Sequence, residues 1–144
     1  MATTNQALTG EWQFVATLTV DGTPIPNNWD AIDGGDTSSP TRQYRPGGRI
    51  TPEVIPAVKV TGDVILERAY RGGVDGEHRK TLASKIGKEA VVTVFALDEA
   101  RNEIPQTRET ISGILKEVTR PAFRSEAEGV ALYRVVVTPK GHWG

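Results

Sequence analysis

The chain of 144 residues is close to the usual size of one domain, and its 38% hydrophobic and 24% charged residues are typical of a folded globular protein. The formal net charge of -1 gives no general attraction for nucleic acid, which proteins bind with clustered Lys and Arg. Cysteine is absent, so disulfides and thiolate metal sites are excluded.

The first residues, MATTNQ, lack the basic and apolar regions of a signal peptide, and no segment approaches the roughly 18 apolar residues of a membrane span. We therefore expect a protein that is made and kept in water and has no membrane partner. The absence of cysteine is compatible with assembly in a reducing cytoplasm.

The first element in the chain is a half-buried strand from Trp12 to Val20, where apolar side chains recur at every second position. Asp21-Gly22 ends it, since this dipeptide tolerates positive φ and favours a tight turn. A second extended piece is expected over Ile25 to Ile32. Prolines in and beside that piece place it at a sheet edge or a bulge.

From Asp33 to Pro56, glycines and prolines interrupt every periodic pattern, which predicts a long irregular loop. Loops of this length inside compact domains are generally functional or disordered. This one carries basic and aromatic side chains: Arg42, Tyr44, Arg45 and Arg49. We expect it to become ordered against a neighbouring subunit rather than to remain a mobile surface loop.

A long strand is expected next, from Ala57 to Tyr70. Val58, Val60, Val64 and Leu66 would line one face, and the polar side chains Lys59, Thr61, Asp63 and Glu67 would line the other.

One helix follows the glycines at 72 and 73. Asp75 is placed to cap it, Gly87 supplies the C-terminal stop, and its narrow apolar stripe contains His78, Leu82 and Ile86. A helix with so narrow a stripe packs as a cover on a sheet.

Three further strands close the domain. The strand from Glu89 to Leu97 is apolar on both faces, and Asp98 to Gln106 is a charged connection. The strand from Thr107 to Thr119 has a bulge expected at Gly113, and Gly129 to Thr138 forms the last strand.

The sum is a single mainly β domain over 1–144, a β-sandwich or partly closed barrel of about six strands with one packed α-helix. Residues 1–10 and 139–144 are expected to be terminal arms, although Trp143 is an unusual side chain to leave in water.

The sequence shows no recognisable active site. His78 and His142 are not at metal-ligand spacing, and no nucleophile motif is present. The carboxylate pairs Asp30/Asp33 and Asp63/Glu67 give only weak support for catalysis, since solvated faces and turns explain them more simply. We therefore expect neither an enzyme nor a cofactor or metal. Strands with two apolar faces and few covering helices instead indicate oligomerisation through sheet edges.

The order of elements resembles that of the bacteriophage tail-tube proteins, over nearly the whole chain. The resemblance is carried by residues 14–22 (FVATLTVDG), 28–30 (NWD), 44–48 (YRPGG) and 60–70 (VTGDVILERAY), followed by a helix and three strands. No single motif among these is diagnostic.

The resemblance implies a structural virion protein. In that family six subunits form a ring, their sheets join into one β-barrel, and the rings stack into a tube that conducts DNA. Expected partners are therefore other copies of the chain, the sheath, tape measure, baseplate or terminator proteins, and double-stranded DNA passing through without specific binding. The protein would reside in the virion tail after assembly in the host cytoplasm.

The resemblance also implies roles for particular segments. Residues 33–56 would form the inter-ring loop, with Arg42, Arg45 and Arg49 on carboxylates of the neighbouring ring. Lys59, Thr61, Asp63 and Glu67 would face the lumen, where carboxylates and hydroxyls repel phosphate or leave it unbound.

Two other readings remain open. The tube of a type VI secretion system or of an extracellular contractile injection system would share the same fold. A monomeric β-barrel that binds a small ligand is less well supported, because the sequence shows no apolar pocket with polar anchors.

Overall fold

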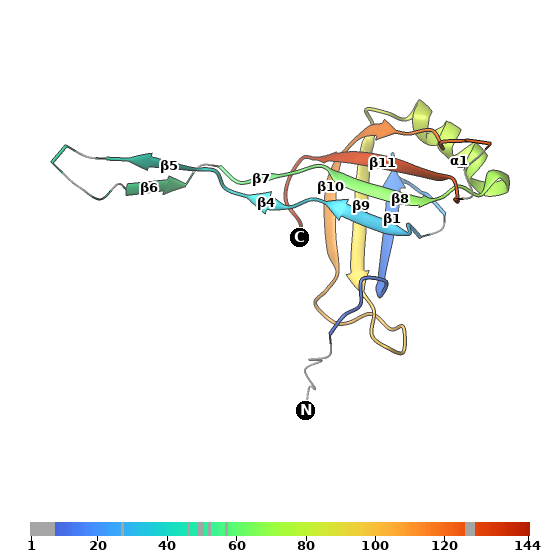
Figure 1. Cartoon of the computed structure of the whole chain (residues 1–144), viewed down its shortest axis with the longest axis horizontal. Coiled ribbons are helices and arrows are strands. Elements are labelled where there is room, and N and C mark those ends of the chain that lie inside the picture. The colour runs from blue at the N-terminus through green and yellow to red at the C-terminus, as the bar shows by residue number, and fades with distance from the viewer. Residues whose placement is uncertain are drawn as a thin grey trace.

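The fold is built on one antiparallel sheet with the strand order β2-β1-β9-β10-β11-β8-β3 (Figure 1). The computed structural model describes residues 8–26, 28–45, 47–48, 51, 53–56, 58–125 and 129–144, with the backbone alone at positions 42 and 56. Two short ladders, β4 with β7 and β5 with β6, extend from the sheet. The elements are β1 (Phe14–Val20), β2 (Thr23–Pro24), β3 (Ala31–Gly34), β4 (Thr37–Ser38), β5 (Thr41–Tyr44), β6 (Glu53–Pro56), β7 (Val60–Thr61), β8 (Val64–Ala69), α1 (Gly72–Ser84), β9 (Glu89–Ala96), β10 (Glu109–Val118) and β11 (Leu132–Pro139).

The expected class, a mainly β fold with one packed helix, is confirmed. The sheet twists so that β1 and β9 run across the direction of β8 and β11 (Figure 1), but in the described part of the chain it does not close into a barrel. More strands are present than the six expected, because short strands occupy much of the segment between β3 and β8. No helix in the described ranges is both long and apolar enough to cross a membrane.

The core contains alternate residues of the long strands, as strand periodicity requires. Fully burying one such aliphatic side chain contributes about 1.5–3 kcal/mol. Trp12, expected on the same face as Leu18, is instead 69% exposed, because β1 begins only at Phe14. The strands supply Ala16, Leu18, Val20, Val64, Leu66, Ala90, Val92, Ile111, Leu115, Tyr133, Val135 and Val137, and the loops and helix add Ile25, Trp29 and Leu82.

The turn predicted at Asp21-Gly22 is confirmed. Both residues have positive φ, 51° and 78°, and the flanking strands pair at Val20 with Thr23. This is the backbone that a two-residue hairpin requires. Pro24 lies in β2 at the outer edge of the sheet, where its missing N–H leaves no gap in a ladder.

The single strand expected from Ala57 to Tyr70 is divided into β7 and β8. At the division the Gly62 N–H donates to the Asp36 carbonyl, and the Gly35 N–H donates to the Asp63 carbonyl, both at 3.0 Å. Gly34 has a φ of 75°, and a Cβ there would lie 2.2 Å from the carbonyl oxygen of Asp63. Glycine therefore allows the segment after β3 and the segment before β8 to bend side by side. The short ladders leave the main sheet at this bend.

Gly113 does not form the bulge expected of it. The register of β10 against β11 shifts between Leu115 and Glu117. At Gly113 itself an added Cβ would lie 2.3 Å from the carbonyl oxygen of Thr138, so this glycine allows the two backbones to approach closely.

The helix α1 begins at Gly72, with Arg71 as its N-cap, so the expected capping role of Asp75 is wrong. Asp75 lies inside the first turn, where its Oδ2 accepts a 2.8 Å hydrogen bond from the Arg71 N–H. On the predicted stripe Leu82 is buried, whereas Ile86 lies beyond the helix end and is half-exposed. The helix ends at Ser84 with Lys85 as its C-cap, so Gly87, with a φ of 93°, lies in the turn two positions after the cap and not at the predicted stop itself.

A buried polar network joins the helix to the sheet. Arg68 Nη2 donates to Asp75 Oδ1 at 2.6 Å, and Arg68 Nε donates to the Tyr133 hydroxyl at 2.6 Å. That hydroxyl donates in turn to Asp75 Oδ1 at 3.1 Å, and burial raises the pKa of Tyr133 well above its ordinary value. The guanidinium also lies 4.4 Å from the ring centroid of Trp29 and donates to the Pro26 carbonyl. The network thus connects β8, β11, α1 and the loop before β3.

The C-terminal segment, residues 140–144, lies against the sheet. Trp143 packs on the core and donates from Nε1 to the Gly35 carbonyl at 2.8 Å, while His142 Nδ1 and the Thr61 hydroxyl share a 2.6 Å hydrogen bond. Gly144 exchanges two backbone hydrogen bonds with Thr110. The segment therefore contacts both strands at the root of the short ladders.

Replacing Asp75 with Ala should lower the free energy of unfolding by about 3–5 kcal/mol, because it leaves the buried Arg68 cation without its carboxylate. Urea denaturation followed by tryptophan fluorescence, to which the buried Trp29 contributes, measures this. Glu77→Ala, at an exposed position of the same helix, should change stability by less than about 0.5 kcal/mol. Equal effects of the two substitutions would contradict the role of the network.

Replacing Trp143 with Ala should speed amide exchange in β4 and β7 without changing exchange in β9, because the indole holds the ladder root through Gly35. Hydrogen-exchange mass spectrometry resolves these segments. Trp143→Phe, which keeps the ring but not the N–H, should give an intermediate rate. Uniform acceleration across the sheet would show instead that Trp143 acts only on global stability.

Candidate assembly surfaces

The segment expected to be an irregular loop forms a two-part antiparallel ladder instead. Thr37 pairs with Thr61 in β4 and β7, and Tyr44 pairs with Glu53 in β5 and β6. Prolines and glycines interrupt the strand pattern where the ladder strands begin and end. Pro40 separates β4 from β5, and the glycines at 47 and 48 lie at the tip. We call residues 37–61 the projecting ladder, since Figure 1 shows it extending far from the main sheet.

Apolar side chains on the projecting ladder are open to solvent. Aromatic and aliphatic groups gathered on a projection with no core beneath it are typical of an interaction site. Tyr44 is 56% exposed, Val54 61%, Ile55 50%, Val58 83% and Val60 54%.

Of the arginines predicted to make inter-ring contacts, the structure describes two. Arg42 lies in β5, and Arg45 follows β5 and is exposed. Arg49 lies outside the described residues. The structure therefore places Tyr44 and Arg45 next to each other at the tip, with both side chains exposed.

The side of the main sheet opposite the core, which we call the open face, mixes hydroxyl and aliphatic groups. Its residues are half-buried or exposed in the single chain, so β9, although apolar on both faces, is fully buried only at Ala90 and Val92 on the core side. The side chains on this face include Val15, Thr17, Thr19, Ile65, Val91, Thr93, Phe95, Thr110, Ser112, Ile114, Val136 and Thr138.

Of the four residues predicted to face a lumen, two lie on the open face. Asp63 forms an ion pair with Lys116 at 3.0 Å, which lowers the pKa of Asp63 and raises that of Lys116. Glu67 lies opposite Arg134 in the adjacent strand. Both sites are solvated, so the attraction contributes little to stability.

The other two do not share that face. Thr61 lies at the ladder root, bonded to Thr37 and His142, and Lys59 is exposed just before β7. The division of the strand at Gly62 separates them from Asp63 and Glu67.

The carboxylates considered for catalysis have structural contacts. Asp30 accepts a hydrogen bond from the Ala69 N–H at 2.9 Å, and Asp33 accepts one from the Gly34 N–H at 2.8 Å. Among the residues that the structure describes, no three side chains of His, Cys, Asp or Glu are grouped so as to bind a metal ion.

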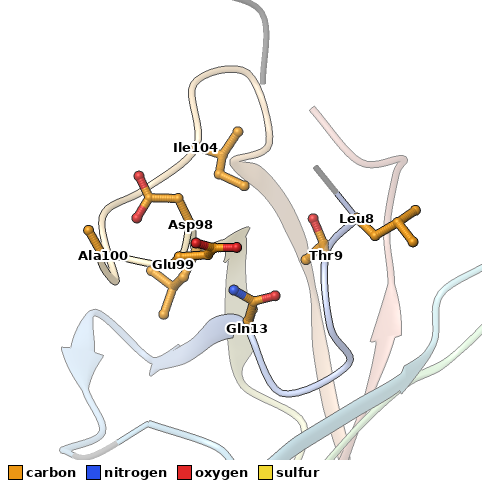
Figure 2. A pocket seen from close by; sticks show the side chains of 8 residues that line it. Leu8, Thr9, Gln13, Asp98, Glu99, Ala100 and Ile104 are labelled. Atoms are coloured by element: carbon orange, nitrogen blue, oxygen red, sulfur yellow. The ribbon is translucent and has the colours of Figure 1, made fainter. Parts of the chain in front are cut away.

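Sequence reasoning missed a cleft of about 350 Å³ at the end of the sheet farthest from the helix (Figures 1 and 2). The connection after β9, which the sequence showed only as charged, forms one wall, and the start of the described chain forms the other. We call this the acidic cleft. Its lining residues are Leu8, Thr9, Gln13, Leu97, Asp98, Glu99, Ala100 and Ile104.

Comparison with known proteins gives matches only in structure: no family model and no curated protein matches the sequence. A chain from the tube-terminating cap of the anti-feeding prophage (AFP) superposes with a TM-score of 0.74 at 15% identity, covering 100% of this chain and 94% of that one. A chain from the sheath/tube terminator of the extracellular contractile injection system PVC gives 0.73 at 17% identity, covering 94% and 95%. A chain from the AFP baseplate gives 0.69 at 17% identity, covering 98% and 95%.

These similarities extend over nearly the whole chain. The fold implied by the tail-tube resemblance is therefore confirmed, and this chain has the fold found in contractile injection assemblies.

Proposed function

We propose that this protein is a structural subunit of a tube, whose copies form rings that stack in a phage tail or a related contractile injection machine. The observation that carries the proposal is the projecting ladder, which extends exposed apolar and basic side chains away from the body of the chain (Figure 1). Its role would be structural rather than catalytic.

The ladder needs a partner for a physical reason. An isolated two-stranded ribbon is marginally stable in water, and among the strands that the structure describes β5 and β6 pair only with each other. Burying side chains such as Tyr44, Val54 and Ile55 against another subunit would supply the apolar contact that the single chain lacks. Neighbouring copies in a ring or stack are the partners that the fold supports.

The open face is our candidate for the tube wall. Hydroxyl groups there, together with Asp63 paired to Lys116 and Glu67 opposite Arg134, would give a phosphate backbone no excess of positive charge to bind, as a conduit for DNA requires. Rings of six and a DNA cargo are proposals drawn from the family resemblance. The sheath, tape measure, baseplate and terminator proteins are the proposed tail partners.

A non-viral contractile injection tube is the second candidate. The similarity to chains of AFP and PVC, the latter named as an extracellular contractile injection system, favours it. Such a tube would use the same ring and ladder contacts with a different cargo.

The double substitution Val54→Ser with Ile55→Ser should abolish assembly while leaving the melting temperature of the subunit nearly unchanged, because both side chains are exposed in the single chain. Negative-stain microscopy of the wild type should show hollow filaments or rings of uniform width. Val74→Ser, an exposed apolar position on α1, is the matched control and should assemble normally. If the wild type stays monomeric at high concentration, the tube proposal is wrong.

Replacing Arg42, Arg45 and Arg49 together with Ala should weaken assembly and flatten its dependence on salt, since the proposed contacts with carboxylates are screened over about 8–10 Å at physiological ionic strength. Light scattering across a salt series measures this. Replacing Arg71, Arg79 and Lys80 around α1 instead removes the same formal charge elsewhere. Unchanged polymerisation of the first variant would exclude the predicted role of the arginines.

A further inference from the structure

We propose that the tip of the projecting ladder of one copy docks in the acidic cleft of another copy, with Tyr44 and Arg45 as the inserted side chains. This inference rests on the proposed function and adds to it the surface that receives the ladder.

One side chain that lines the cleft is a largely buried amide. Gln13 is only 7% exposed, and its Oε1 accepts a 2.6 Å hydrogen bond from the Gly10 N–H. Its amide nitrogen makes no hydrogen bond within the described residues, and Figure 2 shows the amide directed into the space between Glu99 and Thr9. A donor held in this way is suited to an acceptor brought by a ligand, such as a tyrosine hydroxyl.

The acidic wall of the cleft is held in place before any partner arrives. Asp98 Oδ1 accepts a 2.9 Å hydrogen bond from the Asn102 N–H, and the Ile104 N–H donates to the Ala96 carbonyl. Glu99 is exposed and forms no ion pair in the part of the chain described. A fixed turn with a free carboxylate is a ready partner for a guanidinium, which binds carboxylates through two parallel hydrogen bonds.

Apolar groups complete the cleft. Leu97 and Ile104 lie on the wall that carries the carboxylates, and Leu8 on the opposite side is 98% exposed. A tyrosine ring presents an apolar body and a polar end, so it fits a site with aliphatic walls and an amide beneath them. Docking would also remove Leu8 from water.

The charges of the two surfaces are opposite. Residues 41–56 contain three arginines and one glutamate, a formal charge of +2, whereas residues 97–104 contain one aspartate, two glutamates and one arginine, a formal charge of -2. Such complementarity selects the partner and speeds encounter.

The contact must form between copies. In Figure 1 the ladder extends to one side from the root of β4 and β7, whereas the connection after β9 lies at the bottom of the sheet, so a chain does not fill its own cleft. We propose that the contact is head-to-tail and not reciprocal, so that it closes into a ring or continues as a stack and does not end at a two-fold dimer.

Cysteine cross-linking tests the contact cleanly, because the natural sequence contains no cysteine. A chain carrying both Tyr44→Cys and Glu99→Cys should, on mild oxidation, give a series of dimers, trimers and higher products in denaturing electrophoresis. The control pair of Tyr44→Cys with Lys80→Cys, whose second position is exposed on α1, should give no such series. A series of equal strength in the control, or a product that stops at the dimer, would overturn the proposal.

Charge exchange provides a second measurement. Arg45→Glu and Glu99→Arg should each raise the protein concentration needed for assembly by at least about tenfold, and the two together in one chain should restore it. If wild-type filaments form but neither single change has an effect and no cross-linked series appears, the docking proposal fails and the tube proposal stands. A cross-linked series without hollow filaments would support docking and contradict the tube. The absence of both would overturn both proposals.

Discussion

The buried contact between Arg68 and Asp75 is the interaction on which the packing of α1 against the main sheet depends. We call the main sheet together with α1 the body of the subunit. Removing two charges from water is costly, and the cost is offset only when every partner is in place. Here the Tyr133 hydroxyl, the Trp29 ring and the Pro26 carbonyl complete the site around the guanidinium. The network therefore fixes α1, β8, β11 and the loop leading to β3 relative to one another, and β3 pairs along β8.

The direction of the projecting ladder is set by β3 and β8, the strands of the body from which it extends. Gly34, Gly35 and Gly62 allow the chains leaving β3 and entering β8 to bend together, and Trp143 closes the bend from the other side. Side chains at the ladder tip are thus held far from the core by a short series of backbone contacts. A subunit with a rigid body and an oriented projection can repeat the same contact in each successive copy.

Much of the body could be predicted from the sequence, because its strands follow a period of two and its first turn has a distinctive dipeptide. Leu18, Val92 and Leu66 are core residues on that basis, and the packed helix was evident from Leu82. The short strands of the ladder were hidden, since two to four residues between prolines and glycines are too few to show a period. Asp75 was mistaken for a cap because a buried Arg partner seven residues earlier leaves no local signature.

The candidate surfaces were less predictable than the fold. Tyr44 and Arg45 could be proposed as interaction residues from composition, but the acidic cleft joins segments that are more than 80 positions apart in the chain. In the sequence, Gln13 is a polar residue that alternates with apolar residues in a predicted strand. The folded structure shows that its amide is directed into the acidic cleft. The division of one strand at Gly62 likewise separates Thr61 from Asp63, which a continuous pattern would have kept together.

The thinness of the projecting ladder also bears on how growth begins. A two-stranded ribbon without a sheet beneath it gains order when it docks, and ordering of this kind typically costs about 2–5 kcal/mol of the gross interaction energy. Two free subunits meeting in solution bear that cost for a single contact. In the proposed tube a completed ring would offer an incoming layer many contacts at once, so elongation would be favoured over nucleation and assembly would begin only above a threshold protein concentration.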